Sequence, residues 1–416
     1  MDKKLKILVS CYACSPSRGS EPGMGWSFVN GISKTYEVHV ITEKEKWENE
    51  IKTQLAKEPN SNLNFYFIQK KRNRKLRKIW PPSYYWFYRI WQKKALKLAK
   101  NLDSKENFDA VHQLNMVGYR EPGYLWKIEK PFVWGPIGGT QNVPWHIFSI
   151  LNMHGKVFYG GRNLINSFQK KYLRRPKLAA KRSMSRLIAA TPDVQKDILN
   201  FWGESTDIIT EVGTTNLQSN KPSNRKESEP LKIIWSGQHT SGKALHILLK
   251  SLVKLPTNVN WSLDVLGVGK ETKNWKSLAH KLNISEKCNW HGWLQKNDAL
   301  KIMQNGHVFC ITSIKDLTAS VTLESLSLGL PIICLDHCGF SYVVDDSCGI
   351  KINISNPKTI YTDFSSAIST LNNEDVRIKL AKGALKRAQE FTWKKKIEKL
   401  NGIYNSVINE NSNCSQ

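Results

Sequence analysis

Residues 311–352 read ITSIKDLTASVTLESLSLGLPIICLDHCGFSYVVDDSCGIKI, with two apolar runs separated by a polar loop and a helical pattern. This order predicts a strand, a loop, a helix, a Gly-Leu-Pro turn and a second strand. Two strands with a helix between them are typical of a parallel sheet. Asp316 falls in the loop and Glu324 falls eight residues later, within the helix. The pattern therefore places two carboxylates beside the carboxyl end of a parallel strand.

A phosphate site is expected at the start of that helix. The first backbone N–H groups of a helix point outward and carry the positive end of its dipole. Here these groups belong to Ala319, Ser320 and Val321. Lys243 follows the apolar run of residues 231–237 and precedes an apolar helical pattern. A lysine in such a loop can reach the same phosphate.

Short apolar runs alternate with longer helical patterns along the chain, which predicts two α/β domains with parallel sheets. The expected strands are 5–10, 37–42, 63–69, 109–114, 132–136 and 186–191 in the first domain, and 231–237, 262–267, 288–293, 307–312 and 331–336 in the second. Between the two sets, residues 214–230 are polar and contain two prolines, as a linker does.

We therefore expect an amino-terminal domain over residues 1–213, a linker over 214–230 and a second domain over 231–390. Residues 391–416 have helical period and are expected to form a helix that packs back toward the amino-terminal domain. Two such domains predict a ligand in a cleft beyond the carboxyl ends of their strands.

The stretch SCYACSPSRGSEPGMGW, residues 10–26, allows three interpretations: a lipoprotein signal, a Cys-x-x-Cys metal or redox site, and a backbone cradle for a ligand. The apolar run before it is about four residues long, whereas a secretory core needs roughly 7–15. Cys11 and Cys14 lack a second pair at zinc spacing, so buried free thiols are expected there. The same holds for Cys334, Cys338 and Cys348.

The cradle interpretation depends on Gly23 and Gly25, followed by a helix from about Trp26. A dinucleotide fingerprint is disfavoured because Phe28 stands where its third glycine is needed. Glu21 in this loop is suited to hydrogen-bond sugar hydroxyls or to remain solvated at the surface.

A second glycine loop, WGPIGGTQNVP at residues 134–144, also follows a strand and precedes a helix start. Its Gly138 and Gly139 are expected at the cleft with the first loop. His112, at the end of another strand, either enters the cleft or is a hydrogen-bonded histidine of the strand end.

The net charge is +27, and residues 70–100 hold 12 Lys or Arg and seven aromatics but no acid. A second basic run covers 169–182. Three interpretations are a solvated helix face, a nucleic-acid site and an anionic membrane surface. The membrane is favoured and no nucleic acid is expected, because no motif that reads RNA or DNA occurs elsewhere. No stretch reaches the ~18 apolar residues of a membrane span, so we expect a cytoplasmic protein, peripheral on the inner face of the plasma membrane.

Together these motifs resemble the family 4 retaining glycosyltransferases of the glycosyltransferase-B fold. The resemblance rests on Lys243, on Asp316 and Glu324 with seven residues between them, and on the strand entry 329–333. Cys338-Gly339 takes the place of a glycine pair. The stretches at 10–26 and 134–144 resemble a bacterial subgroup that acts on cell-surface polysaccharides. The resemblance implies two Rossmann-like domains that face a central cleft.

By this resemblance, Glu324 binds the nucleotide ribose and Asp316 binds the donor sugar. Lys243 and residues 319–321 stabilise the leaving diphosphate, and Gly237 and Gln238 also line the donor site. Gly23 and Gly25 lie near the diphosphate or the acceptor. The family keeps the anomeric configuration without a protein nucleophile. No metal or other cofactor is expected, and the chain contains no Asp-x-Asp motif.

Three positions depart from the family pattern. Gln238 replaces an arginine of the phosphate loop, and the first acid is Asp316 rather than a glutamate. A histidine that often follows the fifth strand is absent, because Gly135 or Pro136 stands near that point.

The expected function is sugar transfer from a nucleotide sugar to a lipid-linked or surface-polysaccharide acceptor. Two alternatives stay open: a sugar-nucleotide epimerase of the same fold, and a catalytically lapsed basic protein that binds membranes or nucleic acid. The base of the donor depends on the shape of a pocket around residues 264–295.

Overall fold

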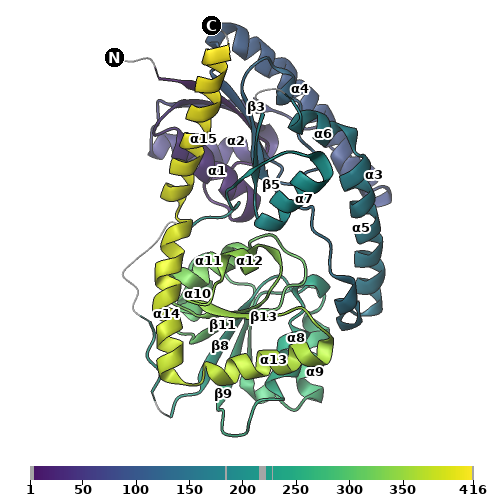
Figure 1. The fold of residues 1–416 in the computed structure, drawn as a ribbon, viewed down its shortest axis with the longest axis vertical. Helices are drawn as coiled ribbons and strands as arrows, with labels where there is room; N and C mark the ends of the chain where they lie inside the picture. Colours follow the sequence, from purple (N-terminus) through teal and green to yellow (C-terminus); the bar gives the residue numbers. More distant parts are fainter. Residues whose placement is uncertain (1–3, 183–184, 215–221, 227, 415–416) are drawn as a thin grey trace. The chain divides into compact units, whose positions relative to one another are not determined.

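The computed structural model describes residues 4–182, 185–214, 222–226 and 228–414, which form two compact units (Figure 1). Unit 1 consists of the described residues within Met1–Thr140, Phe168–Glu211 and Trp393–Gln416. Unit 2 consists of those within Gln141–Ser167 and Val212–Thr392. Each unit is built on its own parallel sheet and has its own hydrophobic core.

The sheet of unit 1 has the strand order β3-β2-β1-β4-β5-β6-β7. Its strands are β1 Lys6–Cys11, β2 Glu37–Glu43, β3 Leu63–Ile68, β4 Ala110–Asn115, β5 Phe132–Ile137, β6 Ser185–Ala189 and β7 Asp207–Ile208. Its helices include α1 Ser20–Ile32, α2 Lys44–Lys57, α3 Arg74–Ile79, α4 Ser83–Glu106, α6 Arg174–Ala180, α7 Pro192–Trp202 and α15 Trp393–Cys414. Consecutive residues of β1 are fully buried, as expected for a parallel strand covered by helices on both faces.

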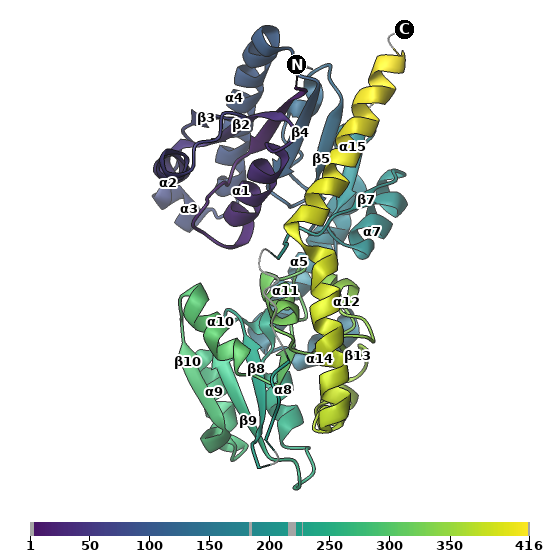
Figure 2. The same cartoon turned by 90° about the vertical axis from the view of Figure 1, so that its left-hand side faces the viewer.

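The carboxyl-terminal helix α15 is part of unit 1 and runs along it (Figure 2). The ring of Trp393 lies 5.1 Å from that of Phe28 on α1. Leu400 and Tyr404 are fully buried in the same core. These contacts place the last helix of the chain against elements formed by its first residues.

The sheet of unit 2 has the strand order β10-β9-β8-β11-β12-β13. Its strands are β8 Leu231–Ser236, β9 Trp261–Leu266, β10 Cys288–Gly292, β11 Val308–Ile311, β12 Ile332–Leu335 and β13 Gly349–Ile352. Its helices include α8 His246–Leu252, α9 Thr272–Lys281, α10 Lys296–Gln304, α11 Ser320–Ser327, α12 Cys338–Val343, α13 Pro357–Thr370 and α14 Glu374–Ala388. The order changes direction at β8, so the loops after β8 and β11 meet at one sheet edge.

Residues 141–167 differ from the sequence expectation, which assigned them to the amino-terminal domain. They belong to unit 2, and they include a 3-10 turn, Trp145–Ile150, and the first part of α5, Met153–Tyr172. Ile147 and Leu151 are buried in the core of unit 2, and the carbonyl oxygen of Ile150 accepts a hydrogen bond from His246 Nε2 at 2.9 Å. Residues 141–167 directly follow the first part of unit 1 in the sequence, but the burial of Ile147 and Leu151 in the other core places them in unit 2.

The expected linker, residues 214–230, is described only in part, because 215–221 and 227 lie outside the described residues. Within it, Arg225 donates a hydrogen bond to the side chain of Asn372 at 2.7 Å, so this part of the segment is held against unit 2. None of the helices in the described parts of the chain combines the length and the apolar character that a membrane span requires.

Candidate functional site

Two charged side chains meet at the carboxyl edge of the unit 2 sheet. Lys243 ends a short 3-10 turn, Ser241–Lys243, that follows β8, and Asp316 lies in the loop after β11. Lys243 Nζ forms an ion pair with Asp316 Oδ2, and the side chains are 21% and 20% exposed. The structure therefore brings together the lysine and the first carboxylate that the sequence singled out.

Hydrogen bonds tie these two loops to each other. Thr312 Oγ1 donates to the carbonyl oxygen of Lys243 at 2.7 Å and accepts from Trp235 Nε1 at 3.0 Å. The backbone N–H of Ile314 donates to the carbonyl oxygen of Gly242 at 2.9 Å. The ion pair thus sits on a preorganised backbone rather than on two independent loops.

The carboxylate of Asp316 is also held by its own loop. Asp316 Oδ1 accepts a hydrogen bond from the backbone N–H of Leu317 at 3.0 Å. The backbone N–H of Asp316 faces the thiol of Cys338 at 3.3 Å, and Gly339 N donates to the carbonyl oxygen of Leu317 at 2.8 Å. The Cys338-Gly339 pair noted in the sequence therefore supports the loop that carries Asp316.

The helix α11 begins directly after this loop. Its N-cap is Ala319, with φ of +61°, and an alanine side chain offers no acceptor to the first N–H groups. Ser320 and Val321 form its first turn. A helix start without a side-chain cap is suited to an anion. Further along, Glu324 pairs with Lys296 Nζ on α10 at 3.4 Å, and a quarter of its side chain is exposed.

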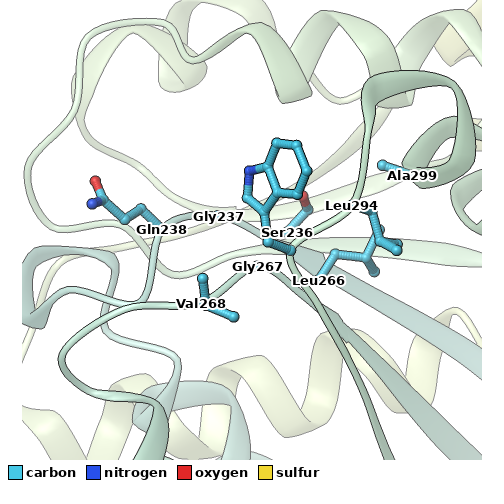
Figure 3. A pocket seen from close by; sticks show the side chains of 9 residues that line it. Ser236, Gly237, Gln238, Leu266, Gly267, Val268, Leu294 and Ala299 are labelled. Carbon is cyan, nitrogen blue, oxygen red and sulfur yellow. The ribbon is translucent and has the colours of Figure 1, made fainter.

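A pocket of about 420 Å³ opens beside Lys243. It lies at the carboxyl ends of β8 and β9, and Figure 3 shows Gln238 at one end with Leu294 and Ala299 at the other. The lining residues are Ser236, Gly237, Gln238, Leu266, Gly267, Val268, Trp293, Leu294 and Ala299. A Cβ atom on Gly237 would lie 3.6 Å from Lys243 Cδ, so the lysine stem borders this pocket. Its lining is mostly apolar.

Tyr159 is a residue that the sequence analysis did not find. It lies on α5, its hydroxyl interacts with the side chain of Ser241, and burial raises its pKa. A side chain at Gly242 would collide with the same hydroxyl. Tyr159 therefore supports the turn that carries Lys243. The sequence does not indicate that Tyr159 lies beside Ser241, because residues 141–167 were expected in the amino-terminal domain.

In unit 1, the loops expected at a cleft converge after β4. Glu21, in the first turn of α1, accepts a hydrogen bond from the backbone N–H of Val117 at 2.7 Å. Burial raises the pKa of Glu21, and this hydrogen bond opposes the rise. Gly138 N donates to the carbonyl oxygen of Val117 at 2.7 Å, and a Cβ on Gly139 would face Gly118. Glu21, Gly138 and Gly139 therefore share one neighbourhood.

A comparison with known protein families finds a match in the carboxyl-terminal half of the chain. Residues 217–386 match the family described as "Glycosyl transferases group 1". This part of the chain is therefore similar to the group 1 glycosyl transferases. Lys243, Asp316, Glu324 and the pocket all lie within the matched residues.

Curated relatives match only part of the chain. The lipopolysaccharide glucosyltransferase WaaG of Escherichia coli K12 is 28% identical over 130 residues, which cover 30% of this chain and 34% of WaaG. The aligned segments span 34–58% of the lengths of the curated relatives.

Solved structures match almost the whole chain. A glycosyltransferase from Rickettsia africae ESF-5 covers 97% of this chain and 99% of its own, with 17% identity and a TM-score of 0.66. HepE of Anabaena, solved in complex with UDP, covers 97% and 100%, with 16% identity and a TM-score of 0.63. These likenesses show the glycosyltransferase-B fold.

The glycines of residues 10–26 lie outside the matched residues 217–386, and close packing explains why Gly23 and Gly25 lack side chains. The helix α1 begins at Ser20, so the expectation of a helix from about Trp26 is wrong, and Gly23 and Gly25 lie inside it. A Cβ on Gly25 would collide with the carbonyl oxygen of Ala13 and lie 2.6 Å from Cys11 Sγ. A Cβ on Gly23 would collide with the backbone of the preceding loop. These glycines allow α1 to pack closely on its own loop.

His112 is not in an open site. It is 1% exposed; its Nε2–H donates to the carbonyl oxygen of Gly135 at 2.9 Å, and its Nδ1 accepts from the Tyr404 hydroxyl at 2.5 Å. Burial lowers the pKa of His112 to about 4, so the ring is neutral at physiological pH. Of the two sequence interpretations, the hydrogen-bonded strand histidine describes it.

The cysteines of the same region are buried free thiols, and burial raises the pKa of Cys14. Among the described residues, one cluster has the spacing of metal ligands: Glu37, His39 and Glu106. Lys6 Nζ already pairs with Glu106 and lies 3.9 Å from Glu37. This cluster contains neither cysteine of the Cys-x-x-Cys motif.

The basic segment 70–100 forms α3 and α4 with an exposed tip. Ile79 is 83% and Trp86 50% exposed, and the cations of α3 are exposed as well. Trp91, by contrast, is buried and donates its Nε1–H to the carbonyl oxygen of Ile68 at 2.8 Å. Lys70 is also buried, 3.6 Å from the ring of Tyr84, and burial lowers its pKa to about 7. Only part of this segment is therefore available to a partner.

Proposed function

We propose that this protein is a retaining, family 4 type glycosyltransferase that moves a sugar from a nucleotide-sugar donor to a lipid-linked or surface-polysaccharide acceptor. The observation that carries the proposal is the Lys243–Asp316 pair beside the uncapped start of α11 and the pocket at Gly237. Few other ligands need a cation, an anion-binding helix start, a hydroxyl acceptor and an apolar slot within one loop cluster.

Before a donor binds, Lys243 and Asp316 neutralise each other's charge. When a diphosphate enters, Lys243 Nζ and the N–H groups of Ser320 and Val321 neutralise it. Asp316 is then released from the lysine and accepts hydrogen bonds from hydroxyls of the donor sugar. Because negative charge grows on the departing diphosphate, these groups stabilise the transition state more than the ground state.

The nucleoside occupies the pocket next to Lys243. Its apolar walls, Val268 and Leu294 among them, suit the flat face of a base. Glu324 exchanges Lys296 for the ribose hydroxyls, which a carboxylate can accept in pairs. The UDP bound in the related HepE structure supports a nucleoside diphosphate donor for this chain.

The chemistry needs no protein nucleophile. The acceptor oxygen bonds to the anomeric carbon on the face that the diphosphate leaves, and its proton passes to a phosphate oxygen. Lys243 and α11 supply the positive charge for this step, so we propose that no metal is required. Gln238, at the end of the pocket, offers an uncharged donor in place of the family's arginine.

The acceptor is proposed to bind unit 1 near Glu21 and the segment 117–119. Its chemistry is suggested by relatives such as the lipopolysaccharide glucosyltransferase WaaG. We further propose a cytoplasmic location at the inner face of the plasma membrane, to which the exposed cations and aromatics of α3 and α4 contribute.

A donor screen tests the proposal. Purified protein is heated with uridine, guanosine or adenosine diphosphate sugars, and the unfolding temperature is recorded. One nucleotide class should raise it in the wild type but not in the Lys243→Ala variant. NMR of the product with that donor should show the anomeric configuration of the donor. If no nucleotide sugar shifts the transition, or if the product is inverted, the proposal is wrong.

A further inference from the structure

The helix α5 has its polarity reversed relative to an ordinary surface helix. Its buried positions are Gly155, Tyr159, Asn163, Asn166 and Lys170. Its exposed positions include Met153, Val157, Phe158, Leu164, Ile165, Phe168 and Tyr172, each more than half exposed. Steps of four, seven and four residues separate Met153, Val157, Leu164 and Phe168, so these side chains lie along one face of the helix.

Contacts of the polar face keep the helix in this orientation. Asn163 Nδ2 donates to the carbonyl oxygen of Val143 at 2.7 Å, and Asn163 Oδ1 accepts from Val143 N at 3.0 Å. Tyr159 lies against the turn at Ser241 and Gly242. Rotation of the helix would break these contacts and leave the buried polar groups without partners. The apolar face is therefore fixed outward.

The charged residues that α5 itself carries are all basic. The sequence contains no Asp or Glu between Glu129 and Asp193. Arg162 and Lys171 are exposed on α5, and Lys156 is partly exposed. The chain then continues into the basic residues of 174–182. An exposed apolar face on a helix that carries cations and no acid matches the requirements of an anionic lipid surface.

We propose that α5 docks on an anionic membrane, with its apolar face at the boundary between headgroups and acyl chains. The combination of an exposed apolar face with Lys156, Arg162 and Lys171 on the same helix favours anionic lipids as the occupant. This surface is distinct from the α3–α4 tip, and the inference does not rest on the transfer activity. In the basic run 169–182, Lys171 and Arg174 are exposed, whereas Lys170 and Arg175 pair with Asp197 and Glu121.

Vesicle co-sedimentation of the full chain tests the proposal. The apolar-face variant is Val157→Gln, Leu164→Gln and Phe168→Gln, since glutamine keeps helix propensity. It should bind vesicles of equal phosphatidylcholine and phosphatidylglycerol at least about tenfold more weakly than wild type at every salt concentration. The matched control changes three exposed apolar residues outside α5, Leu199→Gln, Val253→Gln and Val376→Gln, and should bind like wild type.

The other outcomes separate the alternatives. Equal binding by the apolar-face variant and wild type would overturn the proposal. So would wild-type binding to pure phosphatidylcholine vesicles as tight as to the anionic ones. If wild type fails to bind vesicles but self-associates in sedimentation velocity, and the variant is monomeric, the face is an interface between two copies instead. Unchanged thermal unfolding of the variant shows that folding is not the cause.

A nitroxide label gives an independent readout. The other described cysteines are buried, so labels are placed at Leu164→Cys or Arg162→Cys after Cys414 has been changed to serine. These positions lie on opposite sides of α5. On anionic vesicles, the label at 164 should lose access to a water-soluble nickel complex and the label at 162 should keep it. Equal access at both positions would contradict an in-plane helix.

Discussion

The two units carry the same local pattern, a parallel strand followed by a glycine-containing loop and a helix, yet the two loop clusters differ in what they leave open. In unit 2, Lys243 and Asp316 remain about one-fifth exposed and pair with each other beside a pocket. In unit 1, Gly25 packs on its own loop and His112 is sealed between Tyr404 and Gly135. Glycine spacing alone therefore does not distinguish a ligand site from close packing, whereas partly exposed charges beside a pocket are available to a ligand.

The strongest test of this contrast is Lys243→Ala. Loss of the cation should remove roughly 2–4 kcal/mol of transition-state stabilisation, on the scale of one preorganised donor. The expected result is a fall of about thirty- to a thousandfold in kcat/KM for the nucleotide sugar. Steady-state kinetics with the donor found in the screen measure it.

Lys351→Ala is the matched control, because Lys351 is also partly exposed and pairs with Asp336 at 3.7 Å in the same unit. Its kcat/KM should stay near that of wild type. Equal losses in the two variants, or no loss in Lys243→Ala, would remove the assignment of the donor diphosphate to Lys243.

A second test concerns the loop cluster of unit 2 that contains Lys243, Asp316 and Glu324. It separates nucleotide binding from catalysis. Glu324→Gln should weaken the nucleotide by about 1.5–3 kcal/mol, the range of a hydrogen bond to a charged group. KM for the donor should rise while kcat changes little, because the ribose is remote from the reacting atoms. Lys296→Ala, which frees Glu324 from its present partner, should leave KM nearly unchanged. A fall in kcat at constant KM for Glu324→Gln would place this carboxylate in the chemistry instead.

The sequence predicted eleven of the strands in the described residues and the proximity of Lys243 to Asp316, but not the short strands β7 and β13. Alternating apolar runs marked the parallel strands, and the order of β8 and β11 in the sheet brought Lys243 to Asp316 as expected. The resemblance to glycosyltransferases added the fold, which the solved relatives share. These features are local or follow from sheet topology.

Features that depend on distant packing were missed. The exchange of residues 141–167 into unit 2, and with it Tyr159 beside Ser241, leaves no periodic signal in the sequence. The apolar face of α5 was hidden for a related reason. Apolar residues at helical spacing predict burial, and only the three-dimensional contacts of Asn163 show that the polar face is the buried one.

The substitution Gly25→Ala tests the loop cluster of unit 1, in which Gly25 and His112 are buried. A methyl group there would collide with the Ala13 carbonyl oxygen, so the free energy of unfolding should fall by about 1–3 kcal/mol. Gly402→Ala on α15, which has nothing within 4 Å of the added Cβ, should instead stabilise by up to ~1 kcal/mol. Urea unfolding measures both. Unchanged stability of Gly25→Ala together with weaker donor or acceptor binding would restore the cradle interpretation.

The smallest effect concerns His112 and acid. Burial lowers the pKa of His112 to about 4, below the ~6.5 of an unfolded histidine. As the pH falls, the unfolded chain binds a proton that the native state refuses, so stability falls with it. Between about pH 6.5 and about pH 5.5 this one group should cost about 1 kcal/mol. His239, His246 and His307 also have lowered pKa values and contribute to the same slope.

The measurement therefore compares how steeply the free energy of unfolding depends on pH in the wild type and in the His112→Gln variant. His112→Gln keeps one donor and one acceptor but does not titrate, so its unfolding free energy should depend less steeply on pH over this window, by the share of one proton. The stability of the variant at neutral pH does not enter this comparison. Its kcat at saturating donor should match that of wild type, because the ring does not face the ligand. An unchanged slope combined with a large loss of kcat would mean that His112 opens to the substrate during turnover, and the loops around His112 in unit 1 would then take part in the proposed reaction.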